Sequence, residues 1–316
     1  MDALYNAAKP RVVAIGGPTA TGKTALSVAL AKRFGGEIIS ADSMQIYQGL
    51  DVGTAKVTPE EMQGVPHHLV GFLAPEQAFS VADFTTLAGK TITQLTAQGK
   101  LPLVVGGTGL YITSLLNGIG FTPEKVDPAI RQELQARLQA EGSQALYAEL
   151  AAVDPGYAAK VHPNNTPRVI RALELYRATG RKMSAEREAA RPAEKPYRSL
   201  CLCLTCRDRA VLYDRIERRV NLMVENGVLA EAKQVYDHRD TYRTAAQAIG
   251  YKEFFPYFEG TGSLDECTAR LKQATRNYAK RQLTWFRRQN DAVWLYIDEE
   301  NVLDRACELV REFLQQ

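Results

Sequence analysis

Residues 11–34 have the sequence RVVAIGGPTATGKTALSVALAKRF, which joins three local patterns. Residues 11–15 form a short apolar run typical of a buried strand, and residues 24–34 have the apolar spacing of an amphipathic helix. Between them, GPTATGKT at residues 17–24 matches the phosphate-binding pattern G-x4-G-K-[ST] in the strand–loop–helix setting that its mechanism requires. The sequence therefore predicts a loop that binds a chain of phosphates, without indicating ATP in particular.

This loop offers three kinds of phosphate ligand. Backbone amides and the positive end of the following helix cradle phosphate oxygens, Lys23 adds a point charge, and the Thr24 hydroxyl is a candidate ligand for Mg²⁺. The predicted phosphate-binding residues are Gly17, Pro18, Thr19, Ala20, Thr21, Gly22, Lys23 and Thr24.

Two further apolar runs, residues 37–41 and 101–105, are predicted strands, and a capping box at residues 80–83 begins a helix between them. Strands that alternate with helices predict an α/β fold, a parallel sheet of the P-loop NTPase type with helices on both faces. Ligands of such sheets bind at the carboxyl ends of the strands, which is where Gly17, Asp42 and Thr108 fall.

Asp42 follows the second of these strands and has three possible roles. A carboxylate at this position could ligate magnesium, accept a proton from a nucleophile, or cap the next turn. Hydrolysis of ATP is poorly supported, because no later strand-like run ends in the aspartate of a hydrolytic P-loop ATPase. The obvious run, residues 103–105, leads instead into Gly106 and Gly107.

The chain changes character at about residue 122. Residues 123–196 contain no strand-like run, but they contain repeated helix starts at Asp127, Ser143, Asp154 and Thr166. They predict an all-helical insertion domain between two parts of a P-loop core, residues 1–122 and 197–316. In the second part, strands are expected at 197–205 and 292–297. Helices are expected after Asp208 and after a capping box at 263–266.

Basic residues are concentrated in two tracts. The net charge is only +3, yet residues 160–219 carry 15 basic and 7 acidic side chains, and residues 268–290 carry seven basic and no acidic ones. The rest of the chain is correspondingly acidic. Such segregation favours binding to a polyanion such as nucleic acid, although solvated helix faces also carry such runs.

The composition disfavours a secreted or membrane-spanning protein and a protein that depends on its cysteines for disulfides or zinc. No apolar run reaches the length of a signal peptide or a membrane helix, which predicts a protein that neither is secreted nor spans a membrane. The five cysteines suggest neither a disulfide framework nor a zinc site, so a reducing cytoplasm fits best.

Seven segments together resemble one family, the tRNA dimethylallyltransferases, also called isopentenyl-tRNA transferases, in that family's order and over nearly the whole chain. They are GPTATGKT (17–24), SADSMQIYQGLDVGTAK (40–56), PHHL (66–69), LVVGGTGLY (103–111), HPNN with the following PRVIRALE (162–174), AIGYKE (248–253) and TRNYAKRQLTWFR (275–287). The family's eukaryotic members carry a C-terminal zinc finger that has no counterpart here, which implies a bacterial-type enzyme.

The resemblance implies transfer of a dimethylallyl group from dimethylallyl diphosphate to N6 of adenosine 37, beside the anticodon of tRNA. The P-loop and Mg²⁺ then hold the donor's diphosphate, and preorganised cations stabilise the charge that develops on it. The residues that match the family's catalytic positions are Asp42 as the base for N6, Lys23 and Arg219 at the diphosphate, and Thr19 and Thr108 beside the reacting groups.

The same resemblance implies contacts to the anticodon stem-loop of tRNA, with the target base extruded into the site. The matching residues are Asp42, Ser43, Met44, Gln45, Thr108, Arg168, Arg171, Gly250, Tyr251, Lys252, Arg276, Lys280, Arg281 and Gln282. Trp285 and Phe286 are expected to pack in the core rather than to stack on bases. His67 and His68 are expected to have structural or hydrogen-bonding roles rather than to bind metal.

Three alternatives remain at this point. A P-loop small-molecule kinase shares Lys23, Thr24 and Asp42, but it does not explain the insertion or the basic tracts. An adenylate isopentenyltransferase uses a free nucleotide as acceptor, and the tRNA-matching segments argue against it. An RNA-binding adaptor with a relic P-loop need not have retained these three side chains. We expect a monomer.

Overall fold

The computed structural model describes residues 9–121, 127–190, 192 and 194–316. The chain divides into two compact units, one made of Met1–Leu116 and Lys195–Gln316 and the other of Asn117–Glu194. The predicted insertion, residues 123–196, shares residues 123–194 with the second unit. Because the sheet and the P-loop belong to the first unit, each unit is described separately.

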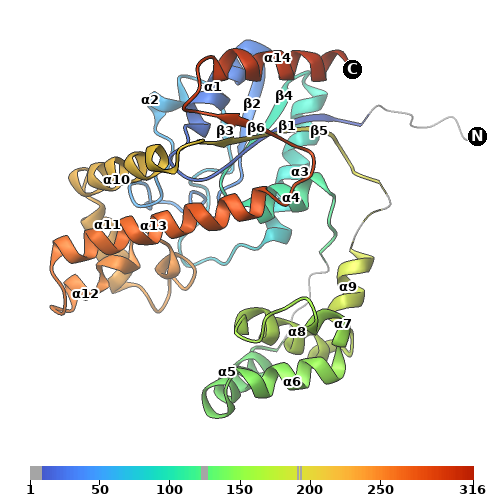
Figure 1. The fold of residues 1–316 in the computed structure, drawn as a ribbon, viewed down its shortest axis with the longest axis vertical. Coiled ribbons are helices and arrows are strands. Elements are labelled where there is room, and N and C mark those ends of the chain that lie inside the picture. Colours follow the sequence, from blue (N-terminus) through green and yellow to red (C-terminus); the bar gives the residue numbers. More distant parts are fainter. Residues whose placement is uncertain (1–8, 122–126, 191, 193) are drawn as a thin grey trace, which may run out of the picture. The chain divides into compact units, whose positions relative to one another are not determined.

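The first unit is built on a six-stranded sheet in the order β3-β2-β4-β1-β5-β6 (Figure 1). Every pair of neighbouring strands is parallel, which confirms the predicted fold. The strands are β1 (Arg11–Gly16), β2 (Gly36–Ser40), β3 (His67–His68), β4 (Leu101–Val105), β5 (Arg198–Thr205) and β6 (Ala292–Tyr296). Ile15 lies level with Val105 of β4 and Leu202 of β5, so the loops that follow these strands begin at one edge.

Both faces of the sheet are buried. On β1, Val13 and Ile15 pack on one side with helices α1 (Lys23–Phe34) and α14 (Val302–Gln315). Val12 and Ala14 pack on the other with α3 (Val81–Ala97), α4 (Gly109–Leu116) and the end of α13 (Leu264–Phe286). The alternation explains why the strand is apolar throughout. The sequence patterns did not predict the short strand β3 or the helix α14.

A third group of buried residues lies outside the sheet in the same unit. It joins residues 46–50 to α10 (Arg209–Glu225), α11 (Val228–Asp237), α12 (Phe255–Phe258) and α13, with two 3₁₀ segments, Ala245–Gln247 and Lys252–Phe254. A short helix, α2 (Pro59–Met62), lies in the chain between β2 and β3. The capping boxes predicted at Ser80 and Ser263 are present at the starts of α3 and α13.

The second unit is a helical bundle. Its helices α5 (Pro128–Glu141), α6 (Ser143–Val153), α7 (Pro155–Ala158), α8 (Thr166–Thr179) and α9 (Met183–Ala189) surround the buried residues Leu134, Leu150 and Leu173. Asp127 and Asp154 cap helices as predicted. The caps predicted at Ser143 and Thr166 are wrong, because Gly142 and Asn165 hold the cap positions and both predicted residues are already helical.

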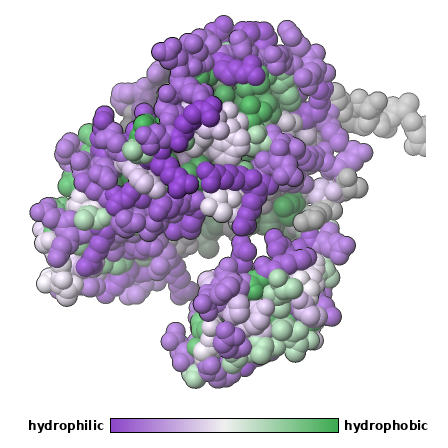
Figure 2. Space-filling model, viewed as in Figure 1, coloured by the Kyte–Doolittle hydropathy of each residue, from purple (hydrophilic) through white to green (hydrophobic). Residues whose placement is uncertain are grey.

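The face of the molecule seen in Figure 2 is mostly hydrophilic, with hydrophobic residues in scattered patches. The large hydrophobic side chains that are exposed within the described residues are Phe72, Leu110, Val211, Leu222, Tyr257 and Leu303. Among the described residues, no helix is both long and apolar enough to cross a membrane.

Candidate active site

The P-loop follows β1, and its shape depends on glycine. Gly17 has a φ of +134°, and a Cβ atom there would lie 2.4 Å from the carbonyl oxygen of Leu204 on β5. Gly22, with a φ of +81°, precedes α1 and offers no side chain to cap its first turn. The first amides of α1 are consequently available to an anion from outside the chain. Within the loop, the Thr21 hydroxyl donates to the carbonyl of Pro18 at 2.9 Å.

Two cationic side chains of different helices meet at this loop. The Lys23 ammonium donates to the carbonyl of Pro18 at 2.7 Å, and Arg219 of α10 donates to the Thr19 hydroxyl at 3.0 Å. Burial and the charge of Arg219 lower the pKa of Lys23 to about 7, although Asp42 opposes this shift. Burial also lowers the pKa of Arg219. Cations whose charged forms are disfavoured in this way gain stability when an anion binds between them.

Asp42 follows β2 and faces the same space. Its Oδ1 atom accepts hydrogen bonds from the amides of Met44 at 2.9 Å and Gln45 at 3.3 Å, so the carboxylate does cap the next turn. The side chain nonetheless lines the cavity beside the P-loop. Capping and a chemical role are therefore compatible, because the turn fixes the direction of the carboxylate.

Thr108, after β4, and Gln282, on α13, connect the loops that form the site. Thr108 accepts from the amide of Ser43 at 3.1 Å, which ties the loop after β4 to the turn that carries Asp42. The buried amide of Gln282 accepts from the amide of Thr19 at 2.9 Å and donates to the carbonyl of Gly107 at 3.0 Å. The Gln282 side chain thus joins the P-loop to the loop after β4, and it also lines the cavity, so its contact with tRNA stays a prediction.

Tyr278 is a site residue that the motif analysis missed. It lies one helical turn before Gln282 on α13 and lines the cavity with Asp42. Burial raises the pKa of Tyr278, and the charge of Asp42 raises it further. The spacing of four residues within the TRNYAKRQ segment was the available signal, since it places both side chains on one face of the helix.

A cavity of about 970 Å³ is lined by Lys23, Asp42, Arg219, Tyr278 and Gln282, whereas Thr108 is not among its lining residues. Its walls come from the P-loop, the turn after β2, residues 51–58, α10, residues 243–252 and α13. Among the described residues, no cluster of three or more His, Cys, Asp or Glu side chains could hold a metal ion. The Thr24 hydroxyl and the Asp42 carboxylate both line the cavity. Such an oxygen donor set fits Mg²⁺, which completes its shell with water and phosphate oxygens.

The segment Gly250, Tyr251 and Lys252, predicted to contact tRNA, divides into buried and exposed parts. Tyr251 is fully buried, and its hydroxyl donates to Glu231 at 3.0 Å, so the prediction of a side-chain contact to tRNA is not supported there. Gly250 has a φ of +116° and packs against the backbone of Gly53. Lys252 is exposed and lines the cavity.

The basic residues of α13 differ in their surroundings. Lys280 and Arg281 are exposed, and the Arg281 guanidinium lies 5.5 Å from the ring centre of Tyr278. Arg276 pairs with Glu217 of α10 at 2.7 Å, which holds α10 and α13 together. Lys280 and Arg281 thus remain the stronger candidates for contacts with an RNA phosphate.

Arg168 and Arg171 belong to the second unit. Both are exposed and lie near the start of α8. Arg171 pairs with the buried carboxylate of Glu174 at 2.8 Å, whereas Arg168 is the freer of the two to meet a phosphate.

The remaining side chains of interest have structural contacts. The Trp285 indole donates to Thr113 at 3.0 Å, and Phe286 is fully buried, so the prediction of core packing is confirmed. His68 bonds with Glu37 at 2.8 Å, and the ring of His67 bonds with the carbonyl of Val65, which agrees with the expected hydrogen-bonding roles. All five cysteines are free.

Residues 45–289 match the family model described as IPP transferase, and residues 10–70 match the one described as isopentenyl transferase. The chain belongs to the IPP transferase family. A tRNA dimethylallyltransferase of Bacillus subtilis is 49% identical over 289 residues, covering 92% of this chain and 91% of the relative. One from Geobacillus thermodenitrificans is 49% identical over 302 residues, covering 95% of each.

Solved structures of this IPP transferase family also match. The tRNA isopentenylpyrophosphate transferase of Bacillus halodurans has a TM-score of 0.71 at 45% identity, over 97% of this chain and 99% of that one. A eukaryotic dimethylallyltransferase acting on tRNA has a TM-score of 0.82 at 31% identity, over 96% of this chain and 79% of that one.

Proposed function

We infer that this chain transfers a dimethylallyl group from dimethylallyl diphosphate to N6 of adenosine 37, beside the anticodon of tRNA. The observation that carries this inference is one cavity lined by two cations at the P-loop, Lys23 and Arg219, and by the Asp42 carboxylate. The products are N6-(dimethylallyl)adenosine and diphosphate. The family match and the relatives that act on tRNA support the same reaction.

The donor's diphosphate is placed at the P-loop. There the amides that begin α1, the Lys23 ammonium and the Arg219 guanidinium surround one end of the cavity. These groups bind the leaving diphosphate more strongly as its negative charge grows in the transition state, which lowers the barrier to breaking the allylic C–O bond. The electron pair of that bond leaves with the diphosphate.

Asp42 is placed at N6 of adenine. Its carboxylate accepts a hydrogen bond from N6 and orients this weak nucleophile toward the allyl carbon. As the N–C bond forms, the extra N6 proton passes to Asp42. Thr19, which is bonded to Arg219, and Thr108, which is bonded to Ser43, lie at the two loops that flank the reacting groups.

Mg²⁺ is proposed as the cofactor, with the Thr24 hydroxyl as its protein ligand. The oxygen groups that line the cavity support it, and the ion would neutralise part of the charge on the diphosphate. We further propose that the enzyme acts as a monomer.

Each unit offers exposed basic residues as candidates for contact with the tRNA. In the first unit, Lys252 and Arg281 are exposed and line the cavity, and the exposed Lys280 precedes Arg281 on α13. In the second unit, Arg168 is the exposed candidate. Such side chains fix the register of the RNA through its phosphates.

The experiment offers two acceptors to the protein with dimethylallyl diphosphate and Mg²⁺. One is an unmodified anticodon stem-loop with adenosine at the target position, and the other is AMP. We expect a five-carbon gain in nucleoside mass on the stem-loop alone. Faster modification of AMP than of the stem-loop would identify an adenylate isopentenyltransferase. A separate incubation with ATP and no prenyl donor tests for a kinase, which would turn over ATP there.

A further inference from the structure

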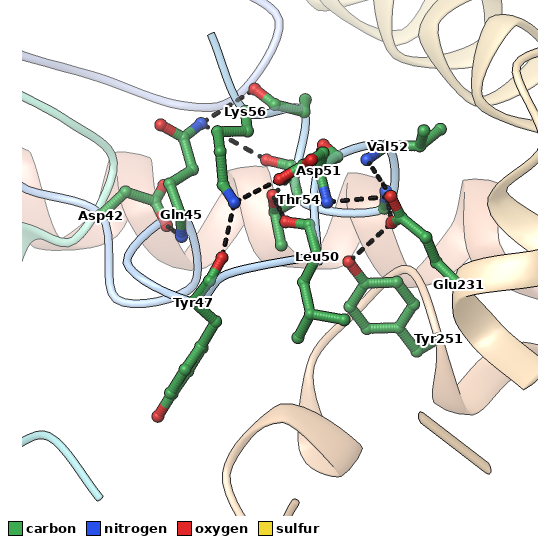
Figure 3. A network of polar contacts seen from close by, with 12 residues as sticks. Asp42, Gln45, Tyr47, Leu50, Asp51, Val52, Thr54, Lys56, Glu231 and Tyr251 are labelled. Carbon is green, nitrogen blue, oxygen red and sulfur yellow. Dashed lines mark hydrogen bonds and ion pairs between the residues drawn. The ribbon is translucent and has the colours of Figure 1, made fainter. Parts of the chain in front are cut away.

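The carboxylate of Glu231, on α11, binds the backbone of a cavity wall formed by residues 51–56 (Figure 3). Its Oε1 atom accepts from the amides of Asp51 at 2.9 Å and Val52 at 2.8 Å. Its Oε2 atom accepts from the amide of Gly53 at 3.0 Å and from the hydroxyl of Tyr251 at 3.0 Å. Both oxygens thus meet donors only, which an ionised carboxylate satisfies and an amide side chain cannot.

Close packing around this carboxylate leaves the wall little freedom. A Cβ atom on Gly53 would lie 2.3 Å from the Tyr251 ring, and one on Gly250 would lie 2.5 Å from the carbonyl oxygen of Gly53. Further along the wall, Ala55 has a φ of +50°, which residues with a side chain rarely adopt. Such a conformation persists only where neighbouring contacts hold it.

The wall is bonded in turn to the residues around Asp42. The side-chain amide of Gln45 donates to the carbonyl oxygens of Ala55 at 2.9 Å and Thr54 at 3.4 Å. The backbone amide of Gln45 donates to Oδ1 of Asp42. A second connection runs through the Lys56 ammonium, which donates to the carbonyl of Tyr47 at 2.5 Å and pairs with Asp51 of the wall.

We propose that Glu231 is a positioning residue for the transfer, which holds the 51–56 wall in place and thereby fixes the turn that aims the Asp42 carboxylate. It acts through the wall and Gln45, because its own oxygens are occupied by the groups described above. The proposal rests on the proposed function, since it assumes that Asp42 faces the adenine. Nothing in the motifs singles out Glu231, which lies about 180 residues along the chain from its amide partners.

The test is the single-turnover rate constant of dimethylallyl transfer at saturating stem-loop and donor. A rate constant, unlike an amplitude, does not change when part of the protein is merely unfolded. Glu231→Ala should lower it by roughly 10- to 100-fold, the cost of a small misplacement of reacting groups. Donor affinity without RNA should change little, because the diphosphate end of the cavity does not involve this wall.

Three further variants make the test specific. Glu231→Gln keeps the size of the side chain but turns an NH₂ group toward donors, so it should be nearly as slow as Glu231→Ala. Tyr251→Phe removes one of the four donors and should cost about fivefold, the value of a single hydrogen bond. Asp237→Ala, an exposed acidic residue of the same helix, should keep the wild-type rate. If both Glu231 variants fail to fold, Tyr251→Phe provides the test, and a wild-type rate constant in this variant would overturn the proposal.

A double-mutant cycle tests the route through Gln45. If Glu231 acts through the Gln45 side chain, adding Glu231→Ala to the Gln45→Ala variant should lower the rate constant much less than adding it to the wild type. The proposal is overturned if Glu231→Ala lowers only the amplitude and keeps the wild-type rate constant. It is also overturned if Glu231→Gln transfers at the wild-type rate, or if the effects of Glu231→Ala and Gln45→Ala are additive. If the wild type itself transfers nothing to the stem-loop, the proposed function fails instead.

Discussion

In the free protein, burial and the charge of Arg219 lower the pKa of Lys23 from 10.5 to about 7. A bound diphosphate places negative charge beside the ammonium and should return this pKa toward its ordinary value. The free protein then holds fewer protons than the complex at pH 8, so binding takes up a proton. Affinity for the donor should fall as the pH rises above 7.

The expected size follows from the two pKa values. With pKa values of about 7 free and about 10.5 bound, raising the pH from 7.5 to 8.5 should weaken binding about eightfold, or roughly 1.2 kcal/mol. Isothermal calorimetry with dimethylallyl diphosphate in the absence of tRNA measures the affinity. Buffers of different ionisation enthalpy report the proton uptake in the same experiment.

Lys23→Arg is the matched control, because a guanidinium stays charged throughout this range. Any pH dependence that remains in this variant comes from the ligand or from other groups, so only the difference between the two proteins belongs to Lys23. A wild-type affinity that is flat between pH 7.5 and 8.5, or equal slopes in both proteins, would refute the reasoning.

Three other predictions concern the loop, the metal and the RNA. Gly17→Ala should lower the free energy of unfolding by about 2 kcal/mol or more, because alanine is strained at this φ and its Cβ would overlap Leu204. Urea denaturation measures this, and an unchanged midpoint would count against the loop geometry. Chelation of Mg²⁺ should slow transfer, and Thr24→Val should raise the Mg²⁺ concentration at half-maximal rate; an unchanged requirement would remove Thr24 as a ligand. Arg168→Ala should weaken tRNA binding and reduce its dependence on salt while leaving donor affinity intact, and an unaltered salt slope would argue against a phosphate contact.

The features of the fold and of the site that the sequence predicts depend on residues close together in the chain. The P-loop, its strand and helix, and the position of Asp42 at a strand end all follow from short patterns. The capping boxes at Ser80 and Ser263 do so too, because their partners are three residues apart. Such contacts form between neighbours in the chain and leave a signal in residue spacing.

The other parts depend on partners far apart in the chain. Gln282 bonds to an amide 263 residues away, and Tyr251 is buried because Gly53 leaves room for its ring. Neither fact is visible in the segments that contain these residues, whose predicted RNA contact comes from the family resemblance alone. For Tyr278, the spacing of four residues from Gln282 places both on one helix face, but only the packed helix shows that this face lines the cavity with Asp42.

The central claim is that Asp42 serves the acceptor while the P-loop cations serve the donor. Asp42→Asn keeps the size of the side chain but removes the proton acceptor. Measured as a single-turnover rate constant at saturating tRNA and donor, its transfer should fall by about 10²–10⁴-fold, the contribution of a positioned base. The affinities for both substrates should stay close to those of the wild type. A variant that transfers the group at the wild-type rate would contradict the account.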